Sequence, residues 1–164
     1  MEIISITSFL DYFERVRERT KSVIKVIPED AMDKAYKPGK LTIADMVRHI
    51  AATERYMFAE NVAGRQSCYH GCGKELADGH AAVLAYVNEM HRQSVEIFKT
   101  LNNEALRRKC PTPGGEMTTW KWLRAMVEHE IHHRGELYIY LNLLGIETPP
   151  IFGLTSEEVI ARSV

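Results

Sequence analysis

The chain has 164 residues, of which 45% are hydrophobic and 26% are charged, and its formal net charge at pH 7 is −1. This composition predicts a single globular domain, residues 1–164, that is large enough to bury a continuous core without disulfide bonds. The net charge is near neutral, and the sequence contains nothing like the basic stripe that neutralises a phosphate backbone, so we expect no nucleic-acid partner.

Residues 1–5 contain no basic stretch followed by an apolar core, and no apolar run approaches the roughly 20 residues that span a bilayer. We therefore expect a cytoplasmic protein that does not insert into membranes. Three cysteines are an odd count in a chain without an export signal, which indicates reduced thiols rather than a disulfide framework.

Periodic apolar residues predict a first helix over residues 7–27, because they recur at spacings of three and four until Pro28 interrupts them. The second helix begins at Thr42, whose hydroxyl can cap the amide near Asp45. Gly64 marks the C-terminal end of this second helix.

Two polar residues of the second helix have informative positions. At about 100° per residue, His49 falls on the flank of the apolar arc and Glu54 falls near its centre. A carboxyl group in a core-facing arc requires a partner or a raised pKa. Glu54 is therefore expected to belong to a buried interaction.

Residues 65–79 are the least regular part of the chain and contain the run Cys68-Tyr69-His70-Gly71-Cys72. A Cys-x3-Cys pair with an intervening histidine is a candidate metal site. However, no second Cys/His pair follows at zinc-finger spacing. We favour the interpretation as a flexible loop.

A third helix is predicted over residues 80–101, with His91 at its surface or boundary. The segment that follows is predicted to be a loop at the rim of a site, because it contains a run that can sustain neither helix nor strand: Cys110-Pro111-Thr112-Pro113-Gly114-Gly115.

A fourth long helix begins at Thr118 or Thr119 and ends at Gly145. The run Thr155-Ser156-Glu157-Glu158 is typical of a capping box and predicts a short terminal helix. Four long amphipathic segments without an alternating strand pattern predict an all-α four-helix bundle with a short C-terminal helix.

Within the fourth helix, His129 and His133 are four residues apart and project from the same face about one turn apart. Both imidazoles can therefore bind one ion. Imidazole ligands suit zinc, nickel, iron or copper, whereas calcium and magnesium prefer oxygen.

His49, His129 and His133 all fall on the flank of the apolar arc of their own helix. If the second and fourth helices are neighbours, these three imidazoles converge at the rim of the core. Three protein ligands leave one coordination position open for water or substrate, which distinguishes a catalytic metal site from a closed structural one.

The alternative for these three residues is that His49 is a boundary histidine satisfied by hydrogen bonds, while the other two are partly exposed. His132 is a competing third ligand. Because it lies three residues after His129 and next to His133, it points away from their shared face, and we do not include it.

Glu54 and Arg134 both face the core, and we expect them to form a buried ion pair. Glu130 is a competing partner of Arg134 at the i+4 spacing. Such a pair either orients the imidazoles or simply joins two helices, and we favour the second interpretation.

Two runs of the chain resemble the DinB family of the DinB/YfiT-like superfamily. The first is His49-Ile50-Ala51-Ala52-Thr53-Glu54, and the second is His129-Glu130-Ile131-His132-His133-Arg134-Gly135-Glu136, which is followed by Leu143-Leu144-Gly145. The likeness extends from the first helix to Gly145. It implies an up-down-down-up four-helix bundle, often dimeric, so a homodimer is expected.

The resemblance also implies a divalent metal ion, with zinc, nickel and iron as candidates, held by His49, His129 and His133. The motif on the fourth helix commonly reads His-Arg-Gly-Gln, and Glu136 stands here in place of the glutamine. Relatives in the superfamily include S-transferases that use bacillithiol or mycothiol and a mycothiol-dependent maleylpyruvate isomerase. The family name records damage-inducible expression.

We therefore consider a metal-dependent S-transferase that acts in stress or detoxification, whose partners are a low-molecular-weight thiol and an electrophile. The alternatives are a non-enzymatic metal-binding stress-response protein and a metal-dependent hydrolase. In the hydrolase, a metal-bound water would attack the substrate, with Glu54 or Glu130 as base.

Overall fold

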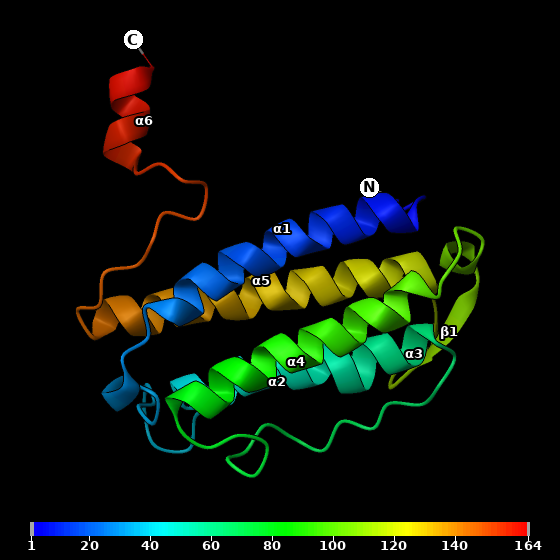
Figure 1. Cartoon of the computed structure of the whole chain (residues 1–164), viewed down its shortest axis with the longest axis horizontal. Helices are drawn as coiled ribbons and strands as arrows, with labels where there is room; N and C mark the ends of the chain where they lie inside the picture. The colour runs from blue at the N-terminus through cyan, green and yellow to red at the C-terminus, as the bar shows by residue number, and fades with distance from the viewer. Residues whose placement is uncertain (1, 164) are drawn as a thin grey trace.

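Four long helical segments pack side by side in the computed structural model, which describes residues 2–163 (Figure 1). α1 and α5 run in one direction, and α2 and α4 run in the opposite direction. This arrangement is the expected up-down-down-up bundle. The four segments are α1 (Ile6–Lys25), α2 (Ile43–Thr53) with its continuation η2 (Glu54–Ala59) and α3 (Glu60–Val62), α4 (His80–Lys99), and α5 (Thr119–Leu143). Two short 3-10 turns, η1 (Glu29–Ala31) and η3 (Ala105–Arg107), lie in the connections.

The predicted helix ends are confirmed where local chemistry sets them. Thr42 and Asp45 form a reciprocal capping box at the start of α2. At the end of α5, Gly145 has a φ of 72°, and the amide of Ile146 donates to the carbonyl of Leu141 at 2.9 Å. This is the Schellman pattern, which requires a left-handed residue and therefore favours glycine.

The second segment is not a regular α-helix throughout. Residues Glu54–Ala59 form a π-helical stretch between α2 and α3. A π-helical turn contains more residues than an α-helical turn and shifts the face that the following residues present, and such turns are frequent at functional sites. Glu54 and Phe58 are both buried in this stretch.

The prediction that residues 110–115 can form no strand is wrong. β1 (Lys109–Thr112) and β2 (Gly115–Thr118) form an antiparallel hairpin in which Cys110 pairs with Met117 and Pro111 pairs with Glu116. Proline is tolerated because both strands of a two-stranded sheet are edge strands, where a missing amide donor leaves no ladder partner unsatisfied. The hairpin lies at one end of the bundle, just before α5 (Figure 1).

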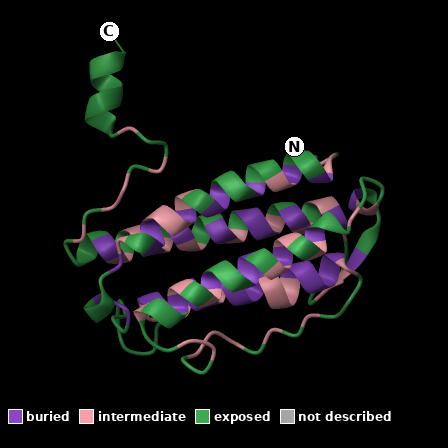
Figure 2. Ribbon diagram, in the orientation of Figure 1, coloured by how far each residue is buried: buried purple, intermediate pink, exposed green. Residues whose placement is uncertain are grey.

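The buried interior is divided into two apolar clusters by a polar layer. One cluster is centred on Val23, Ile50 and Leu141, and the other on Phe13, Phe98 and Leu123. Between them lie buried polar side chains from all four helical segments, namely Arg17, Thr20, Glu54, His91, Ser94, Glu130 and Arg134. Figure 2 shows the buried stripe along each of the four segments.

The connection between α3 and α4 has no regular secondary structure, as predicted, but it is anchored along α2. The amide of Cys68 donates to the carbonyl of Tyr56 at 2.8 Å. The guanidinium of Arg48 donates to the carbonyls of Cys72 and Ala77, both at 2.8 Å. These bonds carry the chain back along the bundle, which allows α2 and α4 to run in the same direction.

The C-terminal arm, residues 146–163, follows α5 and first stays against the bundle: the hydroxyl of Tyr138 donates to the carbonyl of Pro149, and the guanidinium of Arg19 lies 4.9 Å from the ring of Phe152. The end of the arm stands apart from the bundle (Figure 1). It contains the predicted short helix, α6 (Ser156–Arg162), which starts with a capping box between Thr155 and Glu158 and has no buried residue. Across the described part of the chain, no helix combines the length and the apolar character needed to cross a membrane.

Candidate metal centre

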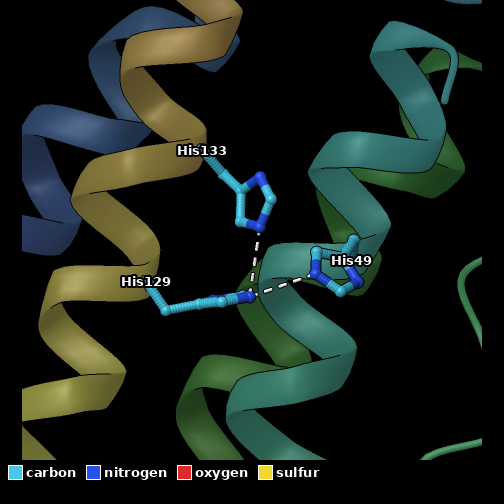
Figure 3. A group of neighbouring side chains, drawn as sticks. All are labelled: His49, His129 and His133. Carbon is cyan, nitrogen blue, oxygen red and sulfur yellow. Dashed lines mark hydrogen bonds between the residues drawn. The ribbon is translucent and has the colours of Figure 1, made fainter. Parts of the chain in front are cut away.

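The three predicted histidines meet between α2 and α5 (Figure 3). The Nε2 atom of His129 lies 3.0 Å from the Nε2 atom of His49 and 3.1 Å from the Nε2 atom of His133. All three side chains are partly buried at the flank of the core, as the apolar arcs predicted. The neighbouring His132 is exposed and is not part of the cluster.

Hydrogen bonding among the imidazoles does not explain this convergence well. A ring nitrogen carries either one proton or one lone pair in the plane of the ring. The Nε2 atom of His129 therefore cannot form two well-directed hydrogen bonds to its two neighbours. A cation placed among the three Nε2 atoms would accept one lone pair from each, so the donor set fits a transition-metal ion.

The environment keeps two of these imidazoles neutral. Burial, together with the neighbouring His133, lowers the pKa of His49 to about 4. Burial and the other histidines lower the pKa of His129 to about 3. Because a metal ligand must offer a free lone pair, a neutral imidazole at pH 7 is the form that binds.

Two side chains fix the orientation of the rings through the opposite nitrogen. The Nδ1 atom of His49 lies 2.8 Å from the hydroxyl of Tyr69, and the Nδ1 atom of His133 lies 2.6 Å from Oε2 of Glu136. A partner that accepts a hydrogen bond from Nδ1, as a carboxylate or a hydroxyl oxygen can, favours a proton there and leaves the lone pair on Nε2, directed at the cluster. Burial raises the pKa of Tyr69, so its hydroxyl stays protonated.

Sequence reasoning missed Tyr69 as a part of the site. It belongs to the anchored connection between α3 and α4, where no periodicity indicates which way a side chain points. The alternative metal site in the same run finds no support. Of the ligand groups found among residues 2–163 that could hold a metal ion, none includes Cys68, His70 or Cys72.

The expected ion pair between Glu54 and Arg134 is wrong. Glu54 instead contacts Arg17 of α1 and accepts a hydrogen bond from Nδ1 of His91 at 3.0 Å. Arg134 donates to the carbonyl of Val16 at 3.2 Å. No ion pair between Arg134 and Glu130 is found among the described residues.

His91 is buried, with 5% of its surface exposed, so its predicted surface or boundary position is wrong. Its second nitrogen, Nε2, lies 2.9 Å from Glu14. Burial alone would lower the pKa of His91, but its hydrogen bond to Glu54 and the charge of that carboxylate raise it overall. The signal that sequence reasoning overlooked is Arg17, which falls inside the apolar arc of the first helix and provides a buried cation.

The expected rim between Pro111 and Gly115 does not border the histidine cluster. Thr119 follows the hairpin directly and is ten residues before His129. Ten residues of α-helix span about 15 Å, so the hairpin lies well away from the cluster along the bundle. Tyr69, from the connection between α3 and α4, contacts the cluster instead.

Comparisons with known proteins agree with this architecture. The curated protein YjoA of Bacillus subtilis, which is uncharacterised, is 26% identical over 148 residues, covering 87% of this chain and 93% of YjoA. The crystal structure of a DinB-like protein from Bacillus cereus has a TM-score of 0.77 at 16% identity, covering 90% of this chain and 97% of that chain. The crystal structure of YjoA, also DinB-like, has a TM-score of 0.70 at 23% identity, covering 88% and 96%.

The two similar crystal structures establish the fold, and a match to a family model assigns the family. A family model described as the DinB superfamily matches residues 12–137, which include all three histidines of the cluster. The chain therefore belongs to the DinB superfamily.

Proposed function

We propose that this protein binds one divalent transition-metal ion, such as zinc, nickel or iron, through His49, His129 and His133, and that the bound ion activates a low-molecular-weight thiol for transfer to an electrophile. The observation that carries the proposal is the convergence of three Nε2 atoms, in which that of His129 lies 3.0 Å from that of His49 and 3.1 Å from that of His133. Three histidine ligands leave a coordination position for an exogenous molecule.

The ion would lower the pKa of a bound thiol and hold it as a thiolate at neutral pH. In the transfer, the thiolate sulfur forms a bond to an electrophilic carbon while the carbon–halogen bond of an alkyl halide breaks, and the halide departs with the electron pair. The thiol proton passes to solvent. The protein holds two of the three imidazoles, those of His49 and His133, in their binding tautomers through Tyr69 and Glu136.

The positions of the nearby carboxylates favour thiol transfer over hydrolysis. A hydrolase needs a base within hydrogen-bond reach of the attacking water. The candidate bases, Glu54 and Glu130, face the polar layer of the core, where both pair with Arg17. The thiol of Cys72 interacts with the hydroxyl of Tyr69, but burial raises its pKa, so Cys72 is a poor nucleophile at neutral pH.

The first test is elemental analysis of the purified protein beside its His49→Ala, His129→Ala and His133→Ala variants. We expect about one tightly held equivalent of a transition metal in the parent and its loss in each variant. His70→Ala is the matched control, because this exposed histidine lies outside the cluster and its loss should leave the metal in place. Metal retained in all three variants, or absent from the parent after reconstitution, would overturn the proposal.

A second test separates an enzyme from a protein that only binds metal. Cobalt-substituted protein is titrated with low-molecular-weight thiols, and the visible spectrum is recorded. A change in the cobalt bands that is absent in the His133→Ala variant would support thiol binding at the metal. A spectrum that no thiol alters would favour a non-enzymatic metal-binding protein.

A further inference from the structure

The carboxylate of Glu136 faces two histidines with its two oxygen atoms. Oε2 lies 2.6 Å from Nδ1 of His133, which belongs to the cluster described above. Oε1 lies 3.4 Å from Nε2 of His132, whose side chain is 67% exposed. One oxygen of Glu136 therefore contacts the partly buried histidine cluster. The other oxygen forms, together with Nε2 of His132, a second pair of potential metal ligands at the surface of α5.

The geometry of this outer pair fits a metal ion. Zinc lies about 2.0 to 2.2 Å from imidazole nitrogen and carboxylate oxygen, and a tetrahedral arrangement places two such ligand atoms about 3.3 to 3.5 Å apart. The 3.4 Å separation between His132 and Glu136 falls in this range. One ligand atom each of His132, His133 and Glu136 lies within 4.8 Å of the others.

We infer that Nε2 of His132 and Oε1 of Glu136 bind a second divalent transition-metal ion, with zinc as the expected occupant. The remaining coordination positions are filled by water, because both ligands lie on the solvent side of α5. Two protein ligands bind more weakly than three, so this outer site fills at higher zinc concentrations than the inner histidine site.

The two sites are coupled through Glu136, and this coupling, unlike the outer site itself, rests on the proposed inner metal. A cation on Oε1 withdraws negative charge from the carboxylate and makes Oε2 a weaker acceptor for Nδ1–H of His133. His133 then becomes a poorer ligand for the inner ion. Coupling between binding sites is reciprocal, so each ion weakens the binding of the other.

The test is equilibrium dialysis of metal-free, full-length protein against increasing free zinc, with bound zinc measured by elemental analysis. We expect two equivalents at saturation in the parent and in the His70→Ala control. The His132→Ala variant should saturate at one equivalent, because it lacks an outer ligand and keeps all three inner histidines. One equivalent in the parent that His132→Ala retains, or two equivalents in His132→Ala, would overturn the outer site.

The Glu136→Gln variant tests the coupling. It should lose the outer equivalent and also bind the inner one about tenfold more weakly, because it removes the charged partner of His133. An inner affinity equal to that of His132→Ala would contradict the coupling. Failure of the inner site gives a different result: the parent would bind one equivalent that is lost in His132→Ala and kept in His129→Ala.

Discussion

At the scale of single residues, the three histidines differ in what holds the nitrogen that faces away from the cluster. His133 is held by Glu136, which lies on the same helix three residues later, so its partner can be found from helical spacing. His49 is held by Tyr69, which comes from the connection between α3 and α4. The identity of this second partner depends on how that connection is anchored to α2.

Replacing Tyr69 by phenylalanine should weaken metal binding by about tenfold, because removing the hydroxyl leaves Nδ1 of His49 without its partner and frees the tautomer of the ring. The measurement is a competition titration with a chromophoric chelator. Tyr36→Phe is the control, since Tyr36 is 66% exposed and lies outside the cluster. Equal affinity in all three proteins would mean that Tyr69 does not orient His49.

The lowered pKa values of His49 and His129 predict how the stability of the metal-free protein changes with pH. In the unfolded chain both imidazoles take up protons as the pH falls below about 6.5. In the folded chain they resist protonation until about pH 4 and about pH 3. The contribution of these two histidines to the free energy of unfolding is therefore complete above pH 6.5 and is lost as the pH falls toward these two pKa values.

The variant His129→Phe isolates this contribution. His91 has a raised pKa and therefore changes the free energy of unfolding with pH in the opposite direction. Because His91 is present in both the parent and the variant, its effect cancels when the two proteins are compared. Between pH 6.5 and pH 5, the unfolding free energy from urea titration should fall more steeply in the parent than in His129→Phe. Parallel curves would show that His129 titrates normally in the folded protein.

At the scale of secondary-structure elements, the polar layer joins the four helical segments near the middle of the bundle. Arg17 of α1 contacts Glu54 of η2, and its Nη2 atom lies 3.0 Å from Oε2 of Glu130 on α5. Burial raises the pKa of Glu130, whereas Arg17 and His91 hold that of Glu54 below its ordinary value against the effect of burial. One arginine therefore compensates two carboxylates with opposite pKa shifts.

Replacing Arg17 by methionine should destabilise the fold by about 3 to 5 kcal/mol, because it removes the buried cation that both Glu54 and Glu130 contact. Urea unfolding followed by circular dichroism measures the change. Arg15→Met is the matched control, since Arg15 is exposed on the same helix and its loss should change stability by less than about 0.5 kcal/mol. A comparable small effect for Arg17→Met would mean that the layer adds little to stability.

The same layer explains which parts of the core the sequence could predict. Helical periodicity correctly directs Glu54, Glu130 and Arg134 toward the interior, because it fixes the side of a helix on which each residue lies. Periodicity contains no information on depth along the bundle axis or on which neighbouring helix supplies a partner. The expected pair of Glu54 with Arg134 was therefore wrong, and Arg17 was overlooked.

At the scale of the whole molecule, local sequence signals predict the helices and their ends. The up-down-down-up directions of the four helical segments were predicted only from the family resemblance. Thr42, Gly64 and Gly145 act through nearby backbone groups, so their effect can be derived from adjacent residues. The hairpin has strands of four residues with proline and glycine between and within them, which leaves no alternating pattern to detect. The apolar arcs of two helices predicted the convergence of the three histidines, but no sequence pattern predicted that Tyr69 contacts them.

The exposure of Phe152 in the C-terminal arm determines how the protein responds to proteases. Of the five phenylalanines, four are at most 3% exposed and lie in the bundle, whereas Phe152 in the arm is 79% exposed. Among the phenylalanine sites, brief chymotrypsin digestion should therefore cut first after Phe152 and release residues 153–164 while the bundle keeps its helical signal. Mass spectrometry identifies the fragment, and Phe152→Ala should abolish this cut. Resistance at Phe152 would mean that another surface covers the arm in solution.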